Sequence, residues 1–356
     1  MDTTEALQFL RSKGIYEQAK ELSPAFRKIF SSCLQAKDEK ILIIGDTGKE
    51  DRLLAPLLSG AYYLAAHDLR HDAKLILQQP KEKGEEAEPH VNEAINTLRE
   101  GNIIITNFSE RLGSMESVGK SFRKFCAKAK HRFISSPGLA SIPKSLLSEA
   151  LEPFHVDYRM LQMTHEKILR QLSEGSQLRV TSDAGTDITF SIDGQQGMAS
   201  DGKYHEPGSG GNLPPGEVYI APKGKEVNGT IVVDGSSRTK DGTTLVSTPI
   251  RIEVASGFIE SIEGGREAKA LQETLEWAAK RSKYPNTVRR LSGFGIGLNP
   301  KAKVIGAGII DQKALGTAHV GIGSNYWFGG NVYAIIHLDQ VFRNPTVSVD
   351  GKKIEF

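Results

Sequence analysis

Short apolar runs alternate with segments of helical spacing in the first half of the chain. The run at 40–45 is apolar and closes on a glycine, which is typical of a buried strand, and residues 51–69 repeat leucines at helical spacing. The same alternation predicts strands at 74–77, 102–106 and 132–134, helices at 91–99 and 116–129, and a leading helix at 4–34. Strands separated by helices of this length pair in parallel. Residues 1–174 are therefore expected to form a doubly wound parallel α/β domain.

The second half has a different pattern, in which apolar and polar residues alternate over short segments. Each segment is bounded by Gly, Pro, Asn or Asp, as in antiparallel strands joined by tight turns. The expected strands are 178–181, 187–192, 217–220, 229–233 and 250–254. A helix at 160–175 precedes them, and a long helix at 267–281 interrupts them. Residues 175–356 are therefore expected to form a β-rich α+β domain.

Composition narrows the class of protein without naming a function. The 356 residues suffice for two domains with separate cores, and 38% hydrophobic and 25% charged residues exclude a disordered chain or a fibre. A net charge of +2 gives no general attraction for nucleic acid. Two cysteines, Cys33 and Cys126, are too few for a disulfide scaffold or a cysteine-built metal site.

No targeting signal is apparent in the sequence. The N-terminus is acidic and then helical, unlike a signal peptide, and no stretch approaches the roughly 20 apolar residues of a membrane span. The sequence therefore predicts a cytoplasmic protein that does not bind membranes.

Three polar segments invite functional interpretations. Gly45-Asp-Thr-Gly48 follows a strand but lacks the Lys-Ser/Thr of a phosphate loop, so a turn is favoured. Glu110-Arg111 follows another strand, where a helix cap is favoured over a ligand site. The glycine-rich loop at 202–212 is compatible with a cover over a substrate or with a mobile hairpin.

The chemically informative residues lie near the C-terminus. His337 and Asp339 are two residues apart on an expected strand, so both side chains point to one face. An imidazole and a carboxylate on one face suit a divalent cation, although a hydrogen bond that fixes the histidine has the same pattern. His319 lies in a glycine-rich segment where the backbone can approach a ligand closely, and Tyr326 follows seven residues later.

Several ordered blocks of the C-terminal half resemble the metalloaminopeptidase family of aminopeptidases T and S. They are 211–222, 229–234, 295–300, 317–330, 337–339 and 345–351. The resemblance implies a cytoplasmic, dimeric exopeptidase that uses a pair of zinc, cobalt or manganese ions to activate water against a peptide substrate. The implied metal ligands are Glu217, His319, Tyr326, His337 and Asp339, with Glu217 and Tyr326 also assigned to catalysis.

The chain departs from that family at Gly293, where the family has a second metal-binding glutamate. The same fold resembles 2,5-dihydroxypyridine dioxygenase, a ring-cleaving enzyme with a single iron(II), a histidine at this position and the same terminal His-x-Asp. His319, His337 and Asp339 match the ligand count of a mononuclear iron centre. Glu217 and Tyr326 match the peptidase, which is the first expectation. An iron(II) dioxygenase is the alternative, followed by a non-catalytic descendant that binds a peptide or small molecule.

Overall fold

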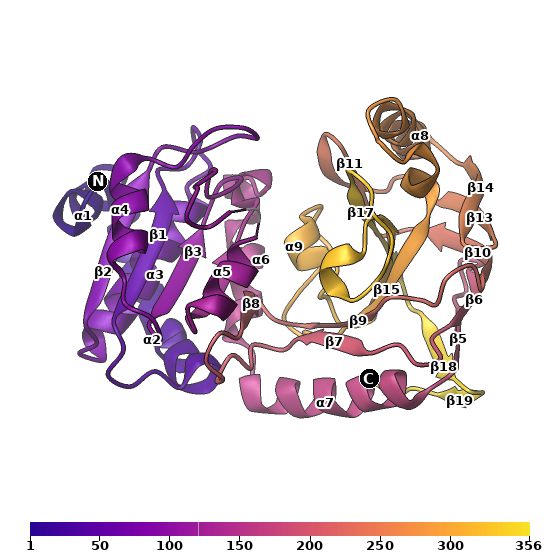
Figure 1. Ribbon diagram of the computed structural model, residues 1–356, viewed down its shortest axis with the longest axis horizontal. Helices are drawn as coiled ribbons and strands as arrows, with labels where there is room; N and C mark the ends of the chain where they lie inside the picture. Colours follow the sequence, from indigo (N-terminus) through magenta and orange to yellow (C-terminus); the bar gives the residue numbers. More distant parts are fainter. Residues whose placement is uncertain (120) are drawn as a thin grey trace. The chain divides into compact units, whose positions relative to one another are not determined.

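The structure is a computed structural model that describes residues 1–119 and 121–356, and it divides into two compact units (Figure 1). Unit 1 comprises Met1–Tyr158 and Gly202–Pro215, and unit 2 comprises Arg159–Asp201 and Gly216–Phe356. The sequence predicts one domain boundary, between residues 174 and 175, and the observed division differs from it at two places. Most of helix α7 (Tyr158–Glu174) belongs to unit 2, and the later segment Gly202–Pro215 returns to unit 1.

Unit 1 contains a five-stranded parallel sheet, sheet A, as the alternation of strands and helices predicts. Its strand order is β2-β1-β3-β4-β8. The bounds are β1 Ile41–Asp46, β2 Ala73–Gln78, β3 Ile103–Asn107, β4 Arg132–Ser136 and β8 Gly210–Asn212. The last strand, β8, lies in the segment Gly202–Pro215, which follows α7 in the sequence but belongs to unit 1. It has only three residues, two of them glycines, so no alternating pattern predicts it.

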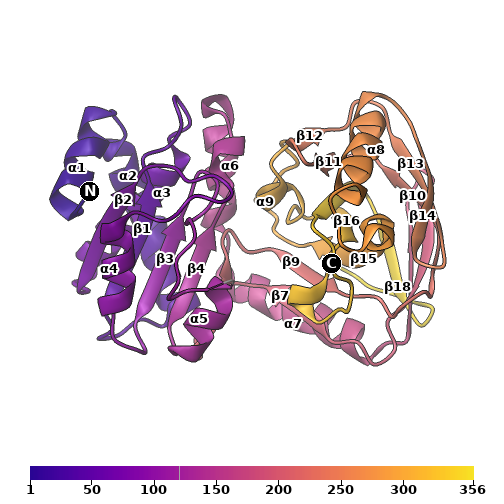
Figure 2. The same cartoon turned by 45° about the horizontal axis from the view of Figure 1, so that its top comes forward.

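The helices of unit 1 cover both faces of sheet A (Figure 2). They are α1 Thr3–Ser12, α2 Tyr16–Ile29, α3 Leu54–Asp68, α4 Pro89–Thr97, α5 Phe122–Lys128 and α6 Leu147–Leu151. The expected leading helix is therefore two α-helices, because Gly14 adopts a left-handed backbone conformation between them. Helix α5 is shorter than the expected helix at 116–129, part of which, residue 120, lies outside the described residues.

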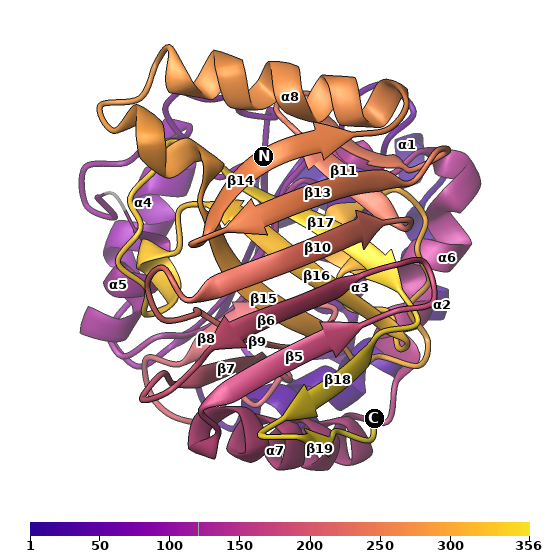
Figure 3. The ribbon, with the colours of Figure 1, turned by 90° about the vertical axis from the view of Figure 1, so that its right-hand side faces the viewer.

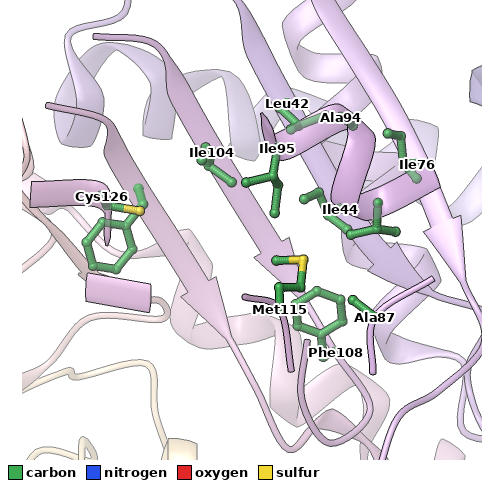
Figure 4. Packing of buried hydrophobic residues seen from close by; sticks show 12 residues of the cluster. Leu42, Ile44, Ile76, Ala87, Ala94, Ile95, Ile104, Phe108, Met115 and Cys126 are labelled. Atoms are coloured by element: carbon green, nitrogen blue, oxygen red, sulfur yellow. The ribbon is translucent and has the colours of Figure 1, made fainter. Parts of the chain in front are cut away.

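The core under α4 and α5 joins four strands of sheet A, β1 to β4 (Figure 4). Ile104 of β3 is fully buried in this cluster, together with Leu42 and Ile44 of β1 and the α4 residue Ile95. Cys126 of α5 is also buried in this cluster, and burial raises the pKa of its thiol to about 12. This cysteine is therefore part of the packing, and its thiol stays protonated at neutral pH.

The turn after β1 is held by a buried carboxylate. Asp46 accepts hydrogen bonds from the backbone N–H and the hydroxyl of Ser109, each at 2.6 Å, and from the Gly48 N–H at 2.9 Å. Gly48 has a φ of 80°, a conformation that glycine adopts at little cost. The Gly45-Asp-Thr-Gly48 segment thus forms a turn tied to the end of β3.

Unit 2 contains two seven-stranded antiparallel sheets and three α-helices (Figure 3). Sheet B is ordered β14-β13-β10-β6-β5-β18-β19, and sheet C is ordered β12-β11-β17-β16-β15-β9-β7. The strands of sheet B are β5 Gln177–Thr181, β6 Asp187–Ser191, β10 Val227–Val233, β13 Ile250–Ala255, β14 Phe258–Glu263, β18 Thr346–Val349 and β19 Lys352–Lys353. Those of sheet C are β7 Gly197–Ser200, β9 Glu217–Ile220, β11 Ser236–Thr239, β12 Gly242–Leu245, β15 Leu291–Gly297, β16 Thr317–Gly323 and β17 His337–Arg343.

The two sheets of unit 2 pack face to face. Phe190 of β6 and Phe294 of β15 meet between them with ring centroids 5.4 Å apart. The expected helix at 267–281 is present as α8 (Arg266–Ala279), and a short helix, α9 (Gly308–Asp311), lies between β15 and β16. A parallel sheet in the first part and antiparallel sheets in the second confirm the expected α/β plus β-rich fold class. No described helix combines the length and apolar character that crossing a membrane requires.

Replacement of Ile104 by alanine tests the core of unit 1. Because the side chain is fully buried, Ile104→Ala is expected to lower the free energy of unfolding by about 2–5 kcal/mol. The matched control is Leu69→Ala, whose side chain is 40% exposed and whose effect is expected within about 0.5 kcal/mol. Urea denaturation followed by circular dichroism measures both, and equal effects would contradict the assignment of this core.

Candidate metal and substrate site

One face of sheet C carries four of the five predicted site residues. Since Phe294 points toward sheet B, its neighbours Gly293 and Gly295 point away from it. The antiparallel register pairs Gly295 with Tyr219 and His319, Gly297 with Glu217, Gly321 with Asp339, and Gly323 with His337. Directly paired residues share a face. Glu217, His319, His337 and Asp339 therefore project from the same face of β9, β16 and β17.

Glycines on β15 make room for side chains from the neighbouring strands. A side chain at Gly295 would collide with the His319 ring, so that ring lies over β15 rather than toward β17. A Cβ at Gly293 would lie 3.2 Å from the Phe328 ring. The position that lacks the expected ligand is thus bordered by an aromatic ring, and any larger side chain there requires Phe328 to move.

His337 and Asp339 form a close pair on β17. His337 Nε2 lies 3.1 Å from Asp339 Oδ1, and His337 Nδ1 lies 2.8 Å from the Ser324 carbonyl oxygen. A carbonyl oxygen only accepts, so Nδ1 carries a proton and Nε2 faces the carboxylate. Burial acts to lower the pKa of His337, but Asp339 outweighs it and the pKa is raised. Burial acts to raise the pKa of Asp339, but His337 holds it well below its usual range.

Glu217 and His319 form a second group with two residues of the loop after α9. Glu217 Oε2 lies 3.7 Å from His319 Nε2, while Glu217 Oε1 accepts a hydrogen bond from Gln312 Nε2 at 3.2 Å. The ammonium of Lys313 lies 3.8 Å from the same Oε1 and is fully buried. Burial lowers the pKa of Lys313, and the carboxylates of Glu217 and Asp339 oppose that effect. Sequence reasoning missed Gln312 and Lys313, which no periodic pattern connects to the site.

Tyr326 is not brought to the other four residues. Its side chain is 62% exposed, and its ring packs against Tyr333 with centroids 5.9 Å apart. Phe328, in the same short helical turn, does approach the site, and its ring centroid lies 5.8 Å from that of His337. Phe328 also packs edge to face against Tyr219, at 5.5 Å between centroids. The loop at 323–336 thus contributes Phe328 to the site and leaves Tyr326 at the surface.

The donor set determines how well a metal ion fits. Two ligands about 2.1 Å from one ion and at right angles lie about 3.0 Å apart, close to the His337–Asp339 separation of 3.1 Å. This separation is that of a His–Asp hydrogen bond, and it also fits two neighbouring positions around a single divalent ion. Within the described ranges, however, no group of three or more His, Cys, Asp and Glu residues is gathered for one ion. The residues fit one ion held by this pair, and they do not fit two ions.

Two solved structures share the fold of this chain over almost its whole length. The structure of 2,5-dihydroxypyridine dioxygenase from Pseudomonas putida KT2440 superposes with a TM-score of 0.71, at 18% identity over 94% of this chain and 95% of that chain. Wild-type AmpT from Thermus thermophilus superposes with a TM-score of 0.62, at 16% identity over 94% and 97% of the two chains. At these identities the likeness establishes the shared fold.

Sequence comparison is more specific. The chain is 27% identical over 219 residues to 2,5-dihydroxypyridine 5,6-dioxygenase from Pseudomonas putida KT2440, covering 58% of this chain. The match spans 61% of the length of that relative. The family model of NicX, 2,5-dihydroxypyridine 5,6-dioxygenase, matches residues 157–355, which is more than half of the chain. The matched range includes Glu217, His319, His337 and Asp339, the four residues on one face of sheet C, hereafter the site face. The chain therefore belongs to the NicX family.

Proposed function

We propose that the chain is a metal-dependent dioxygenase that opens a hydroxylated nitrogen-containing aromatic ring. The observation that carries this proposal is the family match over residues 157–355, which includes the His337–Asp339 pair. The relative matched in sequence and one matched in structure are both 2,5-dihydroxypyridine dioxygenases. A dioxygenase transfers both atoms of O₂ to its product, so ring opening needs no external reductant.

Iron(II) is the metal that this proposal requires, and His337 and Asp339 would hold it. The Ser324 carbonyl keeps a proton on His337 Nδ1, so Nε2, which faces Asp339, is the nitrogen that would bind the metal after giving up its own proton. Asp339 is buried beside it and supplies an anionic oxygen. When bound, iron(II) with open coordination positions supplies the chemistry by which non-haem oxygenases use O₂.

The surroundings of this pair suit a flat aromatic substrate. The Phe328 ring lies next to His337 and against Tyr219, so aromatic surface flanks the pair. Planar rings stack on such side chains and gain about 0.5–1.5 kcal/mol beyond their burial. Asp339 is also under the electrostatic influence of Arg238 on β11, a positive charge suited to an ionised ring hydroxyl.

The aminopeptidase interpretation has less support. The chain shares its fold with AmpT, and the sequence resemblance assigns Glu217 and His319 to metal-ligand positions of the aminopeptidase family. However, Gly293 supplies no ligand, Tyr326 lies at the surface, and Lys313 stands beside Glu217. A pair of divalent ions would need more anionic ligands than this face offers.

Loss of either member of the pair is expected to abolish iron binding. His337→Ala and Asp339→Ala should each weaken iron(II) affinity at least about tenfold, because each removes a direct ligand. Elemental analysis and titration under anaerobic conditions measure the bound iron. The matched control is His155→Ala, an exposed histidine of unit 1, which should bind as the unaltered protein does. Full iron binding by both site variants would contradict this metal site.

Oxygen uptake distinguishes the two enzymatic interpretations. With iron(II) and 2,5-dihydroxypyridine, the protein is expected to consume one O₂ per ring opened, followed with an oxygen electrode and by loss of the ring absorbance. The uptake should be lost in His337→Ala and retained in His155→Ala. Hydrolysis of leucyl p-nitroanilide by zinc-, cobalt- or manganese-loaded protein, without oxygen uptake on dihydroxylated rings, would favour the peptidase instead.

A further inference from the structure

Lys313 is a buried cation that the proposed reaction does not use. It is fully inaccessible to solvent, and within the described part of the chain its Nζ has no hydrogen-bond partner. Its ammonium lies 3.8 Å from Glu217 Oε1 and interacts electrostatically with Asp339. Lysine is almost never fully buried unless it is paired, so its position here requires an explanation.

The loop after α9 holds Lys313 firmly in this place. The Asn299 N–H donates to the Lys313 carbonyl at 2.8 Å, and the Lys313 N–H donates to the Ile310 carbonyl at 2.9 Å. Two residues earlier, Asp311 accepts hydrogen bonds from the N–H groups of Ile305 and Gly306 at 2.8 and 3.1 Å. These hydrogen bonds therefore fix the backbone from which the Lys313 side chain extends to Glu217.

Glu217 and His319 would otherwise be suited to a metal ion. Both are buried, they lie 3.7 Å apart, and a carboxylate with an imidazole is a common donor combination for divalent metals. His319 Nδ1 is buried without a hydrogen-bond partner among the described residues, so no bond fixes this ring from its far side. A metal ion here would lie beside the Lys313 ammonium, and two positive centres in a buried site repel strongly.

We propose that Lys313 acts as the internal counter-cation of Glu217 and thereby prevents the Glu217–His319 group from binding a metal ion, which restricts the site face to one ion. The inference rests on the proposed function for the ion at His337–Asp339, but the blocking role of Lys313 does not. The charges of Lys313, Glu217 and Asp339 sum to −1. One divalent ion brings that sum to +1, whereas two bring it to +3, a charge that a buried site tolerates poorly.

Metal stoichiometry tests the role of Lys313. The unaltered protein and Lys313→Met, which keeps the length and removes the charge, are loaded with zinc or cobalt(II) and analysed by elemental analysis and calorimetric titration. Lys313→Met is expected to bind one ion more per chain than the unaltered protein. In the cobalt form, a new visible absorption band should report the added nitrogen and oxygen ligands.

Two further variants make the result specific. Lys313→Arg keeps the positive charge and should bind as many ions as the unaltered protein, while Lys313→Met combined with Glu217→Gln should lose the added ion. If Lys313→Met does not fold by circular dichroism, Lys313→Gln replaces it. Equal stoichiometry in a folded neutral variant and in the unaltered protein would overturn the inference. Failure of oxygen uptake alone would overturn the proposed function and leave the difference between variants intact.

Discussion

The arrangement of the site face depends on the absence of side chains along β15. Gly293, Gly295 and Gly297 alternate on the face that carries the functional residues, while Phe294 and Ile296 between them are buried on the other face. The His319 ring occupies the space over Gly295, which turns it toward Glu217. Without these glycines, histidine and phenylalanine side chains from the neighbouring segments would not fit over the strand.

The glycines of β15 separate His319 from His337 and Asp339, which the sequence motif groups together as ligands of one site. His337 and Asp339 stay together because they belong to one strand, and the Ser324 carbonyl fixes the imidazole between the backbone and the carboxylate. His319 is on the adjacent strand, yet its ring turns across β15. The two groups also differ in charge, because Asp339 pairs with His337, whereas Glu217 lies beside both His319 and the Lys313 ammonium.

The sequence predicts those features that arise from a repeated local pattern. Apolar runs and helical spacing predict sheet A and its helices, and the spacing of His337 and Asp339 predicts their common face correctly. Strand β8 has three residues and no alternating pattern, so the return of the chain to unit 1 is not predictable from periodicity. Lys313 reaches Glu217 from a loop 96 positions along the chain, and only the tertiary fold brings a pair so distant in sequence together.

Tyr326 shows why a motif position does not by itself assign a role. Its place in the sequence matches a ligand of the resembling family, but the short turn Tyr326–Phe328 directs Phe328 to His337 and leaves Tyr326 against Tyr333. An aromatic hydrocarbon next to His337 offers stacking and excludes water, whereas a phenol would offer a ligand oxygen. With Phe328 rather than Tyr326 next to His337, the site has one metal-ligand oxygen fewer and a surface that suits a planar, apolar substrate. Together with Gly293, this arrangement supports the proposed oxidation of a ring at one ion over hydrolysis by paired ions.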